Sequence, residues 1–119
     1  MSQQVLNSNA LSNLSLSLYG YYLKIGHVRT EEDFTQVRAF FDEKMPEVDL
    51  EQLDSTGLMH YYQSKIWYYH ITQDFRHCYR YARYWIRLFE QKPVLLQAYT
   101  DLYIKFLHHL SLALFYMRA

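Results

Sequence analysis

The sequence predicts a soluble all-α protein of about five antiparallel helices joined as helix–turn–helix units, and three observations lead to this prediction. Half of the 119 residues are hydrophobic and 18% are aromatic, which is ample for a packed core. Glycine and proline are scarce, at three and two residues, which disfavours tight-turned β folds. Apolar residues recur at three- and four-residue steps through most of the chain, the period of an α-helix.

The first helix is expected over about residues 10–25. Its apolar face is formed by Leu11, Leu14, Leu18, Tyr22 and Ile25. A short alternation of leucines in this segment is typical of a strand, but the longer helical period outweighs it. Gly26 is expected to end the helix, because glycine accepts the left-handed conformation found at helix C-termini.

The second helix is expected over residues 31–44, with Thr30 as its N-cap. Asp33 is placed like the acidic partner of a capping box. The apolar stripe of this helix is Phe34, Val37, Phe41 and Met45. Pro46 should stop regular helix just before it, so residues 46–57 are interpreted as a linker with at most one helical turn.

Three further helices are expected over about residues 58–72, 74–91 and 94–117. The helix over residues 74–91 has the clearest period in the chain, with an apolar face of Phe75, Cys78, Ala82, Trp85 and Phe89. Pro93 opens the last helix, since its missing N–H costs nothing at the first helical position. The links between these helices are very short, which forces neighbouring helices to be antiparallel.

An internal repeat is visible in the strings Glu32-Asp33-Phe34 and Gln73-Asp74-Phe75, which lie 41 residues apart. Each string opens an amphipathic helix. The second string belongs to a longer set of aromatic, acidic and small residues that ends in a proline: Tyr62, Tyr69, Asp74, Phe75, Cys78, Ala82 and Pro93. In this order the chain resembles a tetratricopeptide repeat, in which an aspartate and an aromatic stand at the turn, a small residue follows and a proline closes the unit.

The resemblance is best over residues 59–93 and departs from the family elsewhere. Lys65 and Ile66 lie near the place of the family's Leu–Gly pair, and the period exceeds the usual length of about 34 residues. The resemblance implies an α-solenoid that binds other macromolecules. A plain helical bundle is the alternative architecture.

The helix over residues 94–117 has an apolar face wider than one neighbouring helix covers. A terminal repeat normally carries a polar outer face that keeps it soluble. We therefore expect the chain to be either a piece of a longer helical array or a homo-oligomer that buries this helix. The same helix carries a polar stripe, which a membrane span would not keep.

Cysteine content and the first residues indicate a cytoplasmic protein. Cys78 is the one cysteine and cannot form an internal disulfide. The first ten residues contain no lysine or arginine and no compact apolar block, so they do not form a secretory signal.

The formal net charge is zero, but the charges are unevenly distributed. Residues 30–56 carry nine acids and two bases, a net −7, while residues 57–119 carry three acids and eight bases, a net +5. Four of these bases form a row with helical steps of 4, 3 and 4, namely Arg76, Arg80, Arg83 and Arg87. The row can pair with acids of the second helix or of a second copy, bind an acidic peptide or single-stranded nucleic acid, or face solvent.

Thirteen tyrosines are many for this length. Six of them are candidates for a binding groove, because a phenol offers rigid contact area with a polar tip: Tyr61, Tyr62, Tyr68, Tyr69, Tyr99 and Tyr103. The alternative for each is packing between helices.

The six histidines show no spacing typical of a metal site, and the three glycines form no phosphate loop. The sequence therefore predicts neither catalytic nor metal-binding residues and no cofactor. We expect a non-catalytic scaffold for protein–protein interaction, with a nucleic-acid-associated or regulatory helical module as the alternative. An enzyme with several histidines converging on one cleft is a third, weaker option.

Overall fold

The computed structural model describes residues 3–118, whose backbone forms six α-helices, one 3₁₀ turn and no strand. Side chains are described for residues 5–108 and for Ser111, Leu112 and Phe115. The elements are, in chain order, α1 (Gln3–Ile25), α2 (Glu31–Lys44), η1 (Leu50–Gln52), α3 (Ser55–Ile71), α4 (Phe75–Gln91), α5 (Pro93–Ala98) and α6 (Thr100–Arg118). The all-α prediction is therefore confirmed.

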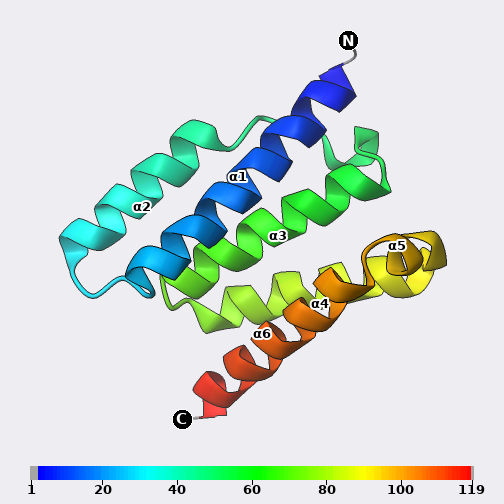
Figure 1. Cartoon of the computed structure of the whole chain (residues 1–119). Coiled ribbons are helices and arrows are strands. Elements are labelled where there is room, and N and C mark those ends of the chain that lie inside the picture. Colours follow the sequence, from blue (N-terminus) through cyan, green and yellow to red (C-terminus); the bar gives the residue numbers. More distant parts are fainter. Residues whose placement is uncertain (1–2, 119) are drawn as a thin grey trace.

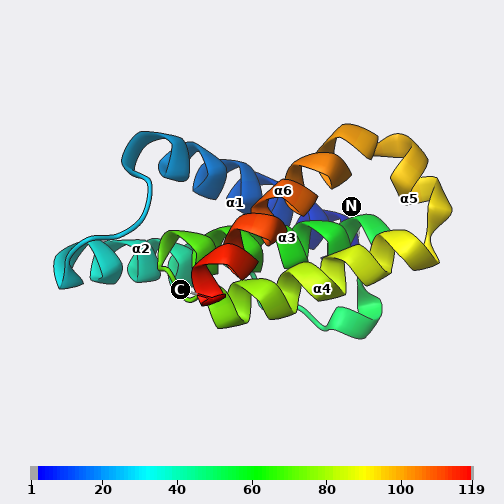
Figure 2. The same ribbon diagram turned by 90° about the horizontal axis from the view of Figure 1, so that it is seen from below.

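The helices alternate in direction along the chain. In Figure 1, α1, α3 and α6 run one way, and α2 and α4 run back. α1 lies along α3, α3 along α4, and α4 along α6, whereas α2 makes few backbone approaches to α1. Figure 2 shows α2 and α5 at opposite ends of the molecule. α3 and α4 are antiparallel neighbours, as the short link between them predicts.

The core lies between α1, α3, α4 and α6 and is rich in aromatic rings. Trp85 of α4 is fully buried, with its ring centroid 4.3 Å from that of Phe89 and 4.9 Å from that of Phe106. Phe106 of α6 also meets Trp67 of α3 edge-on, at 5.4 Å. Such tilted and edge-on pairs add stability beyond their buried area. The core also contains Leu11, Leu14, Leu18, Met59, Ile66, Ile71, Cys78, Ala82, Leu88 and Leu95.

Several helix ends are fixed as the sequence predicts. The Thr30 hydroxyl accepts a hydrogen bond from the Asp33 amide at 3.0 Å, and α2 spans the predicted residues. Gly26 ends α1 with a φ of 76°, a value that suits glycine. The cap of α3 comes from a residue that the sequence analysis did not single out, because the Asp54 carboxylate accepts from the Gly57 amide at 2.7 Å.

Three predicted helices differ in extent, including α3, which begins at Ser55 rather than near residue 58 and so takes up the end of the predicted linker. α1 begins at Gln3 rather than near residue 10. The sequence did not predict these first turns, because they are polar or solvent-exposed and carry no apolar period. The prediction of one helix over residues 94–117 is wrong, since α5 ends at Ala98 and α6 starts at Thr100. The Thr100 hydroxyl donates to the Leu96 carbonyl at 2.6 Å, a side-chain bond that bends helices. The break lets α6 fold back across α4.

The wide apolar face predicted for residues 94–117 is partly covered. Leu95 and Phe106 are buried, and the side chains of Leu110 and Leu114 lie outside the described residues. Four apolar side chains of this segment remain exposed at 76%, 37%, 59% and 68%, respectively: Val94, Leu96, Ile104 and Phe115. Within the described residues, none of the helices combines the length and apolar character that a membrane span requires.

Candidate functional site

One whole face of α3 is built from tyrosines around a single lysine. Residues three and four apart share a side of a helix, so the neighbours of Lys65 on this face are Tyr61, Tyr62, Tyr68 and Tyr69. All five side chains are partly buried.

Lys65 lies among aromatic rings from three helices. Its Nζ is 5.3 Å from the ring centroid of Phe41 in α2, 5.7 Å from that of Tyr61 in α3 and 5.8 Å from that of Tyr81 in α4. Each distance suits a cation–π contact. Burial lowers the pKa of Lys65, while the Asp42 charge acts in the opposite sense. Lys65 therefore connects α2 and α4 to the tyrosine-bearing side of α3.

The tyrosines of α3 meet two tyrosines of α4. The Tyr69 and Tyr81 rings stack with centroids 5.7 Å apart and an interplanar angle of 15°. The Tyr62 and Tyr84 rings lie 5.8 Å apart. We call this set the tyrosine belt: Tyr61, Tyr62, Tyr68, Tyr69, Tyr81 and Tyr84.

Burial raises the pKa of four belt tyrosines above the ordinary value of 10.0, and charges of neighbouring groups contribute less: Tyr61, Tyr62, Tyr68 and Tyr69. At neutral pH these phenols are therefore neutral and can donate as well as accept hydrogen bonds.

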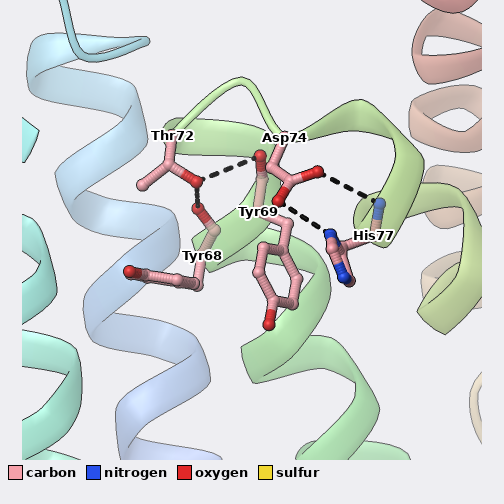
Figure 3. A network of polar contacts seen from close by, with 5 residues as sticks. All are labelled: Tyr68, Tyr69, Thr72, Asp74 and His77. Atoms are coloured by element: carbon pink, nitrogen blue, oxygen red, sulfur yellow. Dashed lines mark hydrogen bonds and ion pairs between the residues drawn. The ribbon is translucent and has the colours of Figure 1, made fainter.

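The turn between α3 and α4 holds the two helices in register (Figure 3). One oxygen of the Asp74 carboxylate accepts from the His77 amide at 3.3 Å, and the other lies 2.8 Å from His77 Nδ1. The His77 ring also stacks on Tyr69, with centroids 5.0 Å apart. The Thr72 hydroxyl donates to the Tyr68 carbonyl at 2.9 Å. These contacts place the first turn of α4 beside the belt.

The predicted arginine row lies on the exposed side of α4, next to the belt. The four side chains Arg76, Arg80, Arg83 and Arg87 are all exposed. None of them forms an ion pair or a hydrogen bond with another described residue. The Arg83 guanidinium lies 5.7 Å from the ring centroid of Tyr79. Four fixed positive charges are thus available to an external partner.

Two shallow hollows make the row and the belt one continuous surface. The first, of about 310 Å³, is lined by Arg76, Tyr79, Arg80, Arg83, Tyr84 and Arg87. The second, of about 230 Å³, is lined by Leu58, Tyr62, Tyr84, Arg87, Leu88 and Gln91. They share Tyr84 and Arg87. We call the row, the belt and both hollows the α4 surface.

The structure separates the six candidate tyrosines into two groups. The four tyrosines of α3 join the α4 surface. Tyr103 instead stacks on Trp85, at 5.7 Å and 14°, and lies 5.3 Å from Phe89. Tyr99 is partly buried against the same core. For these two residues, interhelix packing is what the structure shows.

Lys65, Phe41 and Tyr81 are parts of this surface that were not predicted from the sequence. Lys65 could have been found from its helical spacing, because it stands three or four residues from each α3 tyrosine. Phe41 and Tyr81 carry no such signal, since their contact with Lys65 depends on how α2 and α4 pack on α3.

The acids of α2 do not pair with the arginine row among the described residues. Ion pairs of α2 are internal: Arg38 Nε lies 3.8 Å from Asp42, and Lys44 Nζ lies 4.0 Å from Glu43. The acids of α2 and the arginine row of α4 therefore do not neutralise each other, and both stay exposed.

The histidines and the cysteine add no reactive cluster to the described part of the chain. Within it, no group of three or more histidine, cysteine, aspartate or glutamate side chains could hold a metal ion. Burial raises the pKa of the Cys78 thiol to about 12, with Asp74 contributing less. Cys78 Sγ donates to the Ile66 carbonyl at 3.7 Å. This thiol is protonated at neutral pH and is a poor nucleophile.

Fold and site together define an all-α protein with an exposed tyrosine- and arginine-rich surface. No family model matches the sequence, and comparisons with curated proteins and with solved structures give no match to it.

Proposed function

We propose that the protein is a non-catalytic interaction module whose α4 surface binds an acidic segment of another protein. The arginine row is the observation that carries this proposal. Its guanidinium groups stand about one helical turn apart, without acidic partners among the described residues. A guanidinium offers a planar fork of donors that fits a carboxylate, and such charge-assisted bonds are the strong ones.

The dimensions suit an extended acidic peptide. At about 1.5 Å of rise per residue, the row from Arg76 to Arg87 is about 16 Å long. An extended strand rises about 3.3 Å per residue, so about five residues span the row. Acids on alternate positions would then reach the arginines. The hollow beside Tyr62 and Tyr84 offers apolar contact to the residues between them.

Single-stranded nucleic acid is the competing partner, because phosphates suit arginines and bases can stack on tyrosines. The local surface favours the acidic peptide over this rival more strongly than the charge of the whole chain does. The charge of the whole chain nevertheless also opposes the binding of a polyanion. The net charge is zero, and residues 30–56 carry a net −7 from nine acids and two bases. A long polyanion would meet this negative field, whereas a short peptide would not.

We propose a helical-repeat architecture of the tetratricopeptide type for this module. Three features support it: α1 and α3 run side by side in one direction, α3 and α4 form an antiparallel pair, and Asp74 and Phe75 stand at the turn between them. The loose placement of α2 against α1 is the feature that a plain bundle would explain equally well.

We also propose that two copies associate through the exposed apolar residues of α5 and α6. Ile104 and Phe115 of α6 are 59% and 68% exposed, respectively. Sedimentation velocity over a range of concentrations tests this: the protein should form a dimer, and Ile104→Glu should shift it to monomer. Leu16→Glu, a similarly exposed change on α1, is the control. A wild-type protein that stays monomeric at all concentrations contradicts this proposal.

The peptide proposal is tested by fluorescence anisotropy with two probes. One is a labelled peptide that alternates glutamate and leucine, and the other is a labelled single-stranded oligothymidylate. We expect the peptide to bind and the oligonucleotide to bind more weakly. If the oligonucleotide binds tighter and its affinity falls steeply between about 50 and about 200 mM salt, the partner is nucleic acid.

A double variant and a matched control locate the peptide. Arg80→Gln/Arg83→Gln should weaken peptide binding about tenfold, since each exposed charge pair is worth up to about 1 kcal/mol. Lys24→Gln/Arg29→Gln removes two exposed charges elsewhere and should leave binding unchanged. Equal losses in both variants would show that the attraction is non-specific and that the α4 surface is not the site.

A further inference from the structure

A separate pocket of about 140 Å³ lies on the opposite face of α3, between α1, α3 and α6. Its apolar wall is aromatic: Trp67 of α3 and Phe106 of α6 meet there with ring centroids 5.4 Å apart, and Tyr19 of α1 lies 4.9 Å from Trp67. Gln63 and Lys105 also line it. The α3 residues of this pocket project away from the tyrosine belt, so the pocket is independent of the α4 surface.

Gln63, which lines the pocket, carries a buried hydrogen-bond donor that has no partner in the described structure. The Gln63 side chain is 3% exposed, and its Oε1 accepts from the Ser15 hydroxyl at 3.3 Å. Its Nε2 is buried and has no hydrogen-bond partner among the described residues. A buried amide in this state is unfavourable, and an acceptor brought in from outside would relieve the cost.

Lys105 brings a positive charge to the lining of the same pocket. Lys105 Nζ lies 3.3 Å from the ring centroid of Tyr19 and 5.8 Å from that of Trp67. Lys105 has no ion pair with a carboxylate of the described residues. The aromatic contacts hold the ammonium group at the pocket in a fixed position. The residues that carry the donor, the cation and the flat aromatic wall therefore line one small space.

We propose that this pocket binds a small monocarboxylate with a flat apolar body. The carboxylate accepts from Gln63 Nε2 and pairs with Lys105 Nζ, and the apolar body packs against Trp67 and Phe106. A protein cavity of about 150 Å³ admits benzene, so a single ring fills the available space. Benzoate, which adds a carboxylate to that ring, is the simplest probe. A dicarboxylate would leave its second charge against the apolar wall.

Isothermal titration of the full chain with benzoate tests the proposal. We expect one saturable site, and binding of benzyl alcohol should be at least about tenfold weaker, because it lacks the charge that Lys105 pairs with. Lys105→Met and Gln63→Leu should each weaken benzoate binding about tenfold or more. Lys105→Arg should retain most of the affinity, and Lys92→Met, an exposed charge elsewhere, should retain all of it.

Two results would overturn the proposal. Absence of saturable binding would show that water alone fills the pocket. Binding that Lys105→Met and Lys92→Met weaken equally would place benzoate elsewhere on the protein. If Gln63→Leu fails to fold, as judged by circular dichroism, the comparison of the two lysine variants decides. Titration of Arg80→Gln/Arg83→Gln with benzoate keeps this site apart from the α4 surface, because those changes should leave benzoate binding intact.

Discussion

At the scale of single residues, two glycines, one inside α1 and one directly after it, should respond to alanine in opposite ways. Gly26 has a φ of 76°, where a Cβ is strained, so Gly26→Ala should cost about 1 kcal/mol of the free energy of unfolding. Gly20 lies inside the helix, and a Cβ there meets nothing within 4 Å. Gly20→Ala should therefore stabilise the protein by about 0.5–1 kcal/mol. Urea unfolding of both variants checks this, and changes of the same sign would contradict the helix end at Gly26.

His60 should make the protein less stable in mild acid. Burial lowers the pKa of His60 below 6.5, while Gln63 and Asp54 act in the opposite direction and less strongly. The unfolded chain therefore takes up a proton at higher pH than the folded chain does. The free energy of unfolding is then highest above pH 6.5 and falls as the pH drops through the lowered pKa.

Urea unfolding at pH about 7 and about 5 measures this loss. His60→Gln should reduce the difference between the two values, because glutamine does not titrate. A slope that is the same in His60→Gln and in the wild type would assign the pH dependence to other groups.

At the scale of elements, the partly buried tyrosines of α3 should make the fold less stable at alkaline pH. Burial raises the pKa of the four α3 tyrosines above 10.0, so the unfolded chain loses these protons first. Their contribution to stability is complete below pH 10.0 and is lost as the pH rises through the raised values. Lys65 acts in the opposite sense, because burial lowers its pKa below 10.5, but one lysine stands against four tyrosines.

The free energy of unfolding should therefore fall as the pH rises above about 10. Tyr69→Phe removes one of the buried phenols and should make this fall smaller. In the same samples, the part of the tyrosine absorbance change that comes from these four phenols should accompany unfolding. Early ionisation of all tyrosines in a protein that is still folded would contradict the burial of the belt.

Most helices could be predicted from the sequence, because local signals define them. Thr30 and Gly26 mark helix ends through their own backbone chemistry, and the buried face of α4 has an unbroken period. The break at Tyr99 left no such mark, since an apolar pattern continues on both sides of it and the bend follows from a hydroxyl bond and from packing on α4.

The candidate site was predictable only in part for the same reason. Spacing alone places the arginines of α4 on one side of a helix and the tyrosines of α3 on another. It does not reveal that α3 and α4 bring these sides together, nor that Tyr103 turns toward Trp85 instead. The pocket around Gln63 depends on three helices distant in sequence and has no local signature.

At the scale of the whole molecule, α6 closes the core. The radius of gyration of 14.1 Å is near the value of about 13.5 Å expected for a compact domain of this length. Much of this compactness depends on the return of the chain at Tyr99, which carries Phe106 to the centre between α3 and α4.

Phe106→Ala should therefore destabilise the entire protein by about 3–5 kcal/mol, the usual cost of emptying a buried aromatic site. Ile104, two residues away on α6, is 59% exposed, and Ile104→Ala should change stability by less than about 0.5 kcal/mol. Thermal and urea unfolding followed by circular dichroism compare the two. A mild effect of Phe106→Ala would mean that α6 is detachable from a core that folds without it.

The position of Phe106 also makes tryptophan fluorescence a reporter of the packing of α6. The chain has two tryptophans, and both indoles lie against this one ring. Undocking of the C-terminal helix would let water reach both fluorophores together, which shifts their emission to longer wavelength. Intrinsic tryptophan fluorescence thus follows one event, the packing of α6 onto the core, in real time and without an attached dye.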